Sequence, residues 1–347
     1  MRIVFMGSSE ASCRTLGYIL RFPEFQVVGV VTQPDRPSGR RRKFMPCPCK
    51  AFAMERRLKP IITPEKVNDP EVLDQIRALK PDVIVVVAFG QFLGKTLLGI
   101  PPLGCINGHF SLLPKYRGAS PVQSAIAAGE HETGVTIMQM GLKMDDGDIL
   151  LQRIEPICCD DTGAALMDRL AFLSATLMVQ VLNQMRKGPL FHLPQNPALA
   201  TYAPKMQKND GLLDWTLPAV VLDRRIRAFN NWPGAFTYMP VRHAKGKQLL
   251  GKRIRVKILK VNVITDETLY PEEYESYEPG TVCGFSKDGM PVVRTTGRPM
   301  ELALLQPDGG KVMDGKSFLN GHPLLEGDKF YTTPDDAIPA PTEEDAE

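Results

Sequence analysis

Short apolar runs alternate with amphipathic segments along the first half of the chain. The runs are rich in Val and Ile, and several are continuous, which is typical of strands buried on both faces of a parallel sheet. The segments between them place apolar residues at a spacing near 3.6, which predicts helices. The predicted strands are 2–6, 26–32, 60–63, 83–89, 105–109, 134–140 and 149–154.

Helices are expected between these strands, with a longer one after the last of them. The longer helix should follow an N-cap signal at Asp160, Asp161 and Thr162. Strands that alternate with helices indicate crossover connections. The pattern therefore predicts an α/β fold, with an open, Rossmann-like, mostly parallel sheet in an N-terminal domain of residues 1–188. The predicted helices are 11–21, 47–57, 70–79, 120–129 and 163–186.

The pattern changes after residue 188. Residues 189–206 contain several prolines, and we expect them to form an extended linker that does not pack. Residues 207–330 begin with one predicted helix and continue with short strands, which predicts a smaller, OB-like β-barrel domain. Residues 331–347 hold six acidic residues, three prolines and no base, which predicts a disordered tail.

Composition limits the class of protein. The chain has 347 residues, 43% of them hydrophobic, which is enough for two packed domains. The longest uninterrupted apolar run, 83–89, is far shorter than the ~20 residues that cross a bilayer, and no secretory signal is recognised. We therefore expect a cytoplasmic protein without membrane association. Seven cysteines without a C-x-x-C pair indicate reduced thiols.

Charge is distributed unevenly, although the formal net charge is only +3. Residues 201–260 hold 13 Lys and Arg against three Asp and Glu, whereas 261–280 hold six acidic residues and no base. Solvated surface charge explains any one of these clusters, and it is our interpretation of the acidic insert at 266–278. Two basic clusters together favour a polyanionic partner. The second basic cluster, after the second predicted strand, comprises Arg36, Arg40, Arg41, Arg42 and Lys43.

Two polar side chains end the strand predicted at 105–109. Asn107 and His109 are two residues apart, so their side chains should project from the same face of that strand. An amide and an imidazole side by side can both hydrogen-bond an oxygen that gains negative charge, as a tetrahedral acyl-transfer intermediate requires. The alternative is a polar strand end that caps its own loop.

A tight acidic loop precedes the last strand of the first half. Asp145, Asp146 and Asp148 could bind a metal, or they could simply form the turn that Asp and Gly favour. A carboxylate next to an imidazole favours the charged imidazole and can accept a proton from an amine nucleophile. No Ser-His-Asp order, G-x-S-x-G elbow or dinucleotide-binding glycine motif is present, which favours direct transfer without a covalent acyl-enzyme or a nicotinamide cofactor.

These residues belong to a longer series of motifs that resembles the folate-dependent formyltransferases. The central one is Asn-Gly-His-Phe-Ser-Leu-Leu-Pro-Lys-Tyr-Arg-Gly at 107–118. The resemblance implies transfer of a formyl group from 10-formyltetrahydrofolate to the α-amino group of initiator methionyl-tRNA, without a metal. We expect a monomer. The other matching segments are 1–7, 31–36, 134–140, 145–149, 201–205, 210–215 and 226–238.

The resemblance also implies roles for individual residues. The catalytic amide, imidazole and carboxylate of the family correspond to Asn107, His109 and Asp145. The folate would bind at Phe89, Gly90, Gln91, Phe92, Ser111, Leu112, Leu113 and Pro114. The basic loop and the C-terminal barrel would bind tRNA, and the residues expected to do so are Arg36, Arg40, Arg41, Arg42, Lys43, Lys205 and Lys208.

Three alternatives remain at this point. A formyltransferase acting on a sugar nucleotide or on glycinamide ribonucleotide, or a hydrolase with water as acceptor, would use similar chemistry but would not need a second basic domain. A non-catalytic RNA-binding protein could be built on the same fold. The presence of Asn107, His109 and Asp145 together argues against that last alternative.

Overall fold

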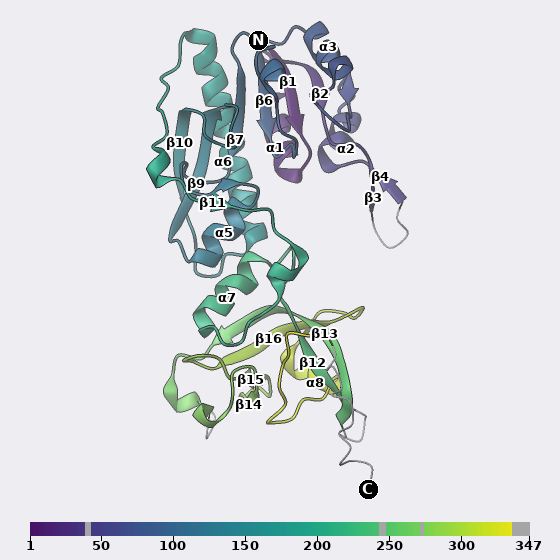
Figure 1. The fold of residues 1–347 in the computed structure, drawn as a ribbon, viewed down its shortest axis with the longest axis vertical. Helices are drawn as coiled ribbons and strands as arrows, with labels where there is room; N and C mark the ends of the chain where they lie inside the picture. Colours follow the sequence, from purple (N-terminus) through teal and green to yellow (C-terminus); the bar gives the residue numbers. More distant parts are fainter. Residues whose placement is uncertain (39–42, 243–247, 271–273, 335–347) are drawn as a thin grey trace, which may run out of the picture. The chain divides into compact units, whose positions relative to one another are not determined.

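The computed structural model describes residues 1–38, 43–242, 248–270 and 274–334, which divide into two compact units (Figure 1). Unit 1 comprises Met1–Ala125, Glu130–Cys159 and Ala164–Lys205. Unit 2 comprises the chain from Met206 onward, together with two short pieces, Ile126–Gly129 and Asp160–Gly163. Each unit has its own sheet, and the two are described separately.

A seven-stranded sheet forms the centre of unit 1, in the order β10-β9-β7-β6-β1-β2-β5. The five strands from β7 to β5 are parallel, whereas β9 is antiparallel to both of its neighbours. The mostly parallel, Rossmann-like sheet predicted from the sequence is therefore confirmed. The strands are β1 (Arg2–Gly7), β2 (Gln26–Val31), β5 (Ile61–Ile62), β6 (Val83–Val87), β7 (Cys105–His109), β9 (Glu132–Gln139) and β10 (Ile149–Pro156).

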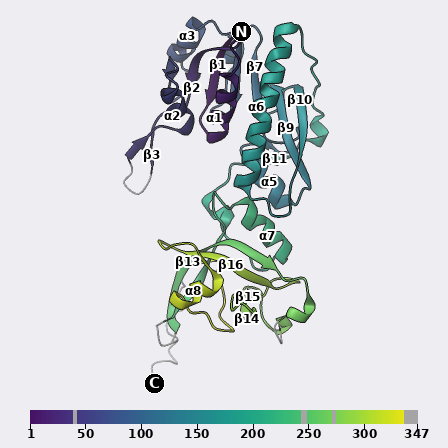
Figure 2. The ribbon, with the colours of Figure 1, turned by 180° about the vertical axis from the view of Figure 1, so that it is seen from behind.

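Helices cover both faces of this sheet, which explains its continuous apolar strands. All five residues of β6 are buried. On one face, α3 (Pro70–Ala78) and α4 (Lys95–Leu98) contribute Ile76 and Leu97 to a cluster with Val4 and Ile84. The other face is covered by α1 (Glu10–Ile19), α2 (Pro48–Glu55) and α6 (Gly163–Lys187) (Figure 2). A further helix, α5 (Pro121–Ala128), lies between β7 and β9 in the chain.

The helix α6 is long and apolar enough to cross a bilayer by length and composition. However, 56% of its most apolar 18-residue window is buried within the structure. A Cβ atom on Gly108 of β7 would lie 2.6 Å from the Ser174 hydroxyl of α6, so the helix packs closely on the sheet. These are the features of a core helix.

The basic loop after β2 contains a short hairpin that the sequence did not predict. Its strands are β3 (Arg36–Ser38) and β4 (Lys43–Met45), which pair antiparallel. The predicted contacts Arg40, Arg41 and Arg42 lie outside the described residues.

The segment predicted to be an unpacked linker instead pairs with unit 1. Leu193 forms a bridge with Ile149, and β11 (Tyr202–Ala203) pairs with β8 (Arg117–Gly118) in parallel. The prediction was wrong here because prolines restrict the backbone but leave neighbouring N–H and C=O groups free to pair. Residues 193–203, called the connecting segment below, therefore belong to the packed structure of unit 1.

Unit 2 is built on a curled antiparallel sheet in the order β12-β13-β16-β15-β14, as expected for an OB-like domain. Val256 and Leu302 of the sheet, Leu222 and Ile226 of α7, and Phe318 of α8 share one core. The elements are α7 (Ala219–Ala228), β12 (Phe236–Arg242), β13 (Gln248–Val263), β14 (Val282–Phe285), β15 (Pro291–Val293), β16 (Met300–Pro307), β17 (Met313–Asp314) and α8 (Gly315–Gly321).

Two segments of unit 2 were expected to be solvated or disordered. In the acidic insert, Tyr274 is only 4% exposed and packs with Cys283 and Val292, so this part of the insert belongs to a small core. At the start of the predicted tail, Tyr331 pairs with Tyr238 of β12, so ordered structure extends past residue 330. Residues 335–347 lie outside the described part of the chain.

Candidate active site

A cavity of about 470 Å³ opens in unit 1 beyond the carboxyl ends of β6 and β7. Ligands of open α/β sheets bind at this edge. Asn107, His109 and Asp145 all line the cavity, so the structure brings together the three residues singled out from the sequence. Its other walls come from the loop after β6, the residues next to Gly118 and the end of β9.

His109 is held in one orientation by a backbone carbonyl. Its side chain is 6% exposed, and its Nε2 atom lies 2.9 Å from the carbonyl oxygen of Tyr116. Because a carbonyl oxygen only accepts hydrogen bonds, Nε2 carries the hydrogen in this contact. The other ring nitrogen, Nδ1, lies 3.7 Å from Oδ2 of Asp145. Nδ1 is therefore the atom of His109 that remains for chemistry.

Tyr116 is itself fixed by hydrogen bonds from its backbone N–H and from its side-chain hydroxyl. Its backbone has a φ of +59°, its N–H donates to the Thr201 hydroxyl at 2.8 Å, and its own hydroxyl donates to Glu130 at 2.8 Å. The Tyr116 hydroxyl, together with Lys115, lowers the pKa of Glu130. Burial, followed by the contact with Glu130, raises the pKa of Tyr116, which keeps its hydroxyl a donor. The carbonyl that orients His109 is thus anchored.

Asp145 lies on a tight loop that brings its carboxylate to His109. Its backbone is left-handed, with a φ of +50°, and its Oδ2 accepts the Gly118 N–H at 2.8 Å. The loop folds closely onto the end of β9, since a Cβ atom on Gly147 would lie 1.8 Å from the carbonyl oxygen of Gln139. Only glycine fits at that position, which explains why residue 147 is a glycine.

Asn107 presents a free amide to the cavity. Its backbone is paired on both sides, with Val86 of β6 and Met138 of β9. Gly108, between Asn107 and His109, faces α6, so the two polar side chains share the opposite face of β7. Within the described residues, the Asn107 side chain has no hydrogen-bond partner. An amide in this position can bind a ligand without first breaking a contact in the protein.

The loop after β6 provides four of the predicted folate-binding residues. Phe89, Gly90, Gln91 and Phe92 line the cavity. The side chain of Gln91 accepts the Val67 N–H and donates to the Pro64 carbonyl, so it holds the loop in place. The backbone of Gly90 is left-handed, with a φ of +84°.

The other four predicted folate-binding residues do not line the cavity. Ser111 and Leu113 are buried, and Leu112 and Pro114 are half-buried away from it. Thr136 donates its hydroxyl to the Ser111 carbonyl, and the same hydroxyl accepts the Leu113 N–H. These residues therefore form a packed support for the segment that carries Tyr116.

Four of the predicted tRNA-binding residues are described by the structure, and all four lie on the surface. Arg36 forms an exposed ion pair with Glu65 at 2.6 Å. Lys43, Lys205 and Lys208 are exposed. The structure does not place any of these four in the cavity.

Several cavity residues were missed from the sequence. Met138, Met140 and Met144 provide flexible apolar contacts, and Lys143 places an exposed cation at the lining. The sequence could have indicated these residues, because they lie within or directly beside the motifs at 134–140 and 145–149. Among the described residues, no group of three or more His, Cys, Asp and Glu is arranged to hold a metal ion. Asp145 of the acidic loop accepts the Gly118 N–H.

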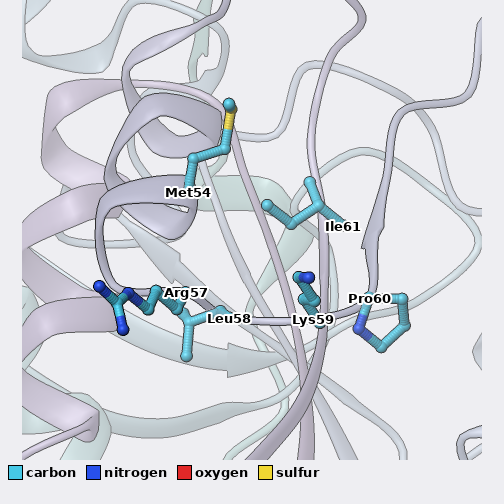
Figure 3. Close-up of a pocket in the computed structure, with 6 residues that line it drawn as sticks. All are labelled: Met54, Arg57, Leu58, Lys59, Pro60 and Ile61. Carbon is cyan, nitrogen blue, oxygen red and sulfur yellow. The ribbon is translucent and has the colours of Figure 1, made fainter.

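A second, larger cavity of about 800 Å³ lies elsewhere in unit 1 (Figure 3). Its walls are apolar apart from two basic side chains, and it contains no acid, amide or imidazole. We therefore do not assign chemistry to it. The lining residues are Met54, Arg57, Leu58, Lys59, Pro60 and Ile61.

Comparison with known proteins shows two family matches and close relatives. Residues 1–182 match Formyl transferase, and residues 205–323 match Formyl transferase, C-terminal domain. The methionyl-tRNA formyltransferase of Citrifermentans bemidjiense is 41% identical over 327 residues, covering 94% of this chain and 95% of that protein. That of Geobacter sulfurreducens is 41% identical over 330 residues, covering 95% and 96% respectively.

Solved structures share the fold at much lower identity. HypX from Aquifex aeolicus in complex with tetrahydrofolic acid is 17% identical, with a TM-score of 0.58 over 92% of this chain and 47% of that one. The sugar 3N-formyl transferase WlaRD is also 17% identical, with a TM-score of 0.58 over 87% and 96%. At this identity the likeness concerns the fold alone.

Proposed function

Because the chain belongs to the formyl transferase family, we propose that it acts as a methionyl-tRNA formyltransferase, which transfers a formyl group from 10-formyltetrahydrofolate to the α-amino group of initiator methionyl-tRNA. The observation that carries this proposal is the cavity in which Asn107, His109 and Asp145 meet. The relatives named above match both units of the chain at about two-fifths identity.

Asn107 and His109 stabilise the oxygen that becomes negative when the amine attacks the formyl carbon. The Asn107 amide donates directly. For His109 to donate from Nδ1 while Nε2–H remains bonded to the Tyr116 carbonyl, the ring must carry both hydrogens and a positive charge. The Asp145 carboxylate, 3.7 Å from Nδ1, balances that charge.

Asp145 also manages the proton of the attacking amine. As the new C–N bond forms, the nitrogen becomes positively charged and must lose one proton. Asp145 accepts it, and His109, in contact range of Asp145, passes a proton to N10 of the folate as the C–N10 bond breaks. The reaction therefore moves one formyl group forward and one proton back, without a metal or a covalent enzyme intermediate.

The donor binds against the loop after β6. Phe89, Leu93 and Met140 give an apolar wall, and the loop backbone at 88–92 supplies hydrogen-bonding groups for the polar edge of a flat ring. Ser111, Leu112, Leu113 and Pro114, which the family resemblance assigns to the folate, belong to the segment held by Thr136. The tRNA binds through the basic residues of the hairpin loop and of unit 2. The enzyme acts as a monomer in the cytoplasm.

The test of this function is a comparison of acceptors with the purified chain and 10-formyltetrahydrofolate. We expect transfer to charged initiator methionyl-tRNA and none to uncharged tRNA, an amino-sugar nucleotide or glycinamide ribonucleotide. Formate release without an acceptor would indicate a hydrolase instead. Transfer to the sugar nucleotide in preference to the charged tRNA would overturn the proposal.

A further inference from the structure

Gln195 contacts the two loops that carry the active-site groups. Its side-chain Nε2 donates to the carbonyl oxygens of Asp145, at 2.9 Å, and Gly147, at 2.7 Å. Its Oε1 accepts two hydrogen bonds from Arg117, from Nε at 3.1 Å and from a terminal guanidinium nitrogen at 2.7 Å. One amide therefore joins the loop of Asp145 to the strand residue next to Tyr116.

The rest of the connecting segment follows the same two loops. At one end, Leu193 exchanges two backbone hydrogen bonds with Ile149, just after the acidic loop, at 2.9 and 3.0 Å. At the other end, Thr201 accepts the Arg117 N–H on its carbonyl and the Tyr116 N–H on its hydroxyl, both at 2.8 Å. Gln195 is the side chain of this segment that bonds to the backbone of Asp145 itself.

Asp145 needs such support because its own backbone is unfavourable. An aspartate with a φ of +50° is held only when surrounding contacts fix it. Oδ2 of its carboxylate accepts a hydrogen bond from the Gly118 N–H at 2.8 Å and lies 3.7 Å from Nδ1 of His109. The two Gln195 bonds fix the peptide group that follows Asp145 and the one that follows Gly147, and so limit how far the carboxylate can move.

We propose that Gln195 is a positioning residue for formyl transfer, which holds the Asp145 carboxylate at its working distance from His109. This inference rests on the proposed role of Asp145. The carbonyl groups of Asp145 and Gly147 require a donor, whereas Arg117 requires an acceptor. The two halves of the Gln195 amide therefore have separable functions.

The substitution Gln195→Glu separates them. Glutamate still accepts from Arg117 but has no hydrogen to donate to the two carbonyl groups. We expect kcat to fall by about 10- to 100-fold, the effect of a small misplacement of a reacting group, while KM for the folate changes by less than about 3-fold. Asn196→Asp is the matched control, since it makes the same change at the next, exposed residue and keeps an acceptor for the Ala198 N–H. It should leave kcat unchanged.

A double-substitution cycle shows whether Gln195 acts through Asp145. In the Asp145→Asn background, adding Gln195→Glu should lower kcat by less than about 2-fold, because the group being positioned is already inactive. If Gln195→Glu unfolds the chain, Gln195→Met removes the donor without adding charge, and the same loss of kcat is expected. Thermal melting identifies the folded variants.

The outcomes distinguish this inference from the function on which it rests. Full kcat in folded Gln195→Glu and Gln195→Met would overturn the role of Gln195 and leave the proposed function standing. The same conclusion would follow if Gln195→Glu lowered kcat by the same factor in the Asp145→Asn background as in the unmodified protein. Full kcat in Asp145→Asn would overturn the role of Asp145 and, with it, that of Gln195.

Discussion

The Tyr116 carbonyl oxygen accepts a hydrogen bond from Nε2 of His109 at 2.9 Å, and this contact determines which ring nitrogen faces Asp145. Since Nε2 is occupied, only Nδ1 can donate to a developing negative charge. The role assigned to His109 therefore depends on a backbone group seven residues later in the chain, which is held by Thr201 and Glu130.

Asn107→Ala should lower kcat without unfolding the protein. The substitution removes a donor that has no partner among the described residues, so little folded-state stability depends on it. Removing one oxyanion donor costs about 10²- to 10³-fold in kcat at comparable sites. Steady-state kinetics with saturating folate and methionyl-tRNA, together with thermal melting, measure both quantities. An unchanged kcat would show that the amide does not contact the oxyanion.

Asp145→Asn should lower kcat and alter the dependence of kcat on pH, with a smaller effect on KM for the folate. The amide keeps an oxygen that can accept the Gly118 N–H, so the loop should remain folded. It cannot accept the amine proton or balance a charged His109. A pH series of kcat for both proteins measures the effect. Loss of melting temperature with full activity per folded molecule would identify Asp145 as a turn residue only.

The sequence predicted the sheet well because the signals for it are local. The continuous Val and Ile run of β6 and the two-residue spacing of Asn107 and His109 each depend on a few neighbouring positions. The contacts of Ser111 with Thr136 and of Gln195 with Asp145 do not. They join residues 25 to 50 positions apart in the chain, and no local pattern specifies such pairs. Prolines also concealed the connecting segment, because they resemble a linker in composition.

Gly147→Ala should destabilise unit 1. A Cβ atom there would overlap the Gln139 carbonyl oxygen, and backbone on both sides leaves little room to move. Overpacking of this kind costs about 1–3 kcal/mol or more. Urea denaturation measures the change in the free energy of unfolding. Gly99→Ala is the matched control for the side-chain volume, since its φ is −91° and the nearest atom recorded around its added Cβ lies at 3.5 Å. Equal stability of the two variants would contradict the close approach.

The basic loop should act on tRNA binding and not on the chemistry. Replacing Arg40, Arg41 and Arg42 with Ala should raise KM for methionyl-tRNA and flatten its salt dependence, because each lost phosphate contact reduces the slope by about one. KM for the folate should not change. Measuring KM at several salt concentrations, with Arg77→Ala on α3 as an exposed-arginine control, tests this. An unchanged slope would indicate solvated surface charge.

The most direct test of the active-site assignment is the single-turnover rate of formyl transfer by His109→Ala, with both substrates saturating. We expect the rate to fall by about 10²- to 10³-fold, because the substitution removes the donor that the Tyr116 carbonyl orients. His131→Ala, at an exposed position, should transfer at the rate of the unmodified protein. A folded His109→Ala protein that transfers formyl at the rate of His131→Ala would contradict the assignment.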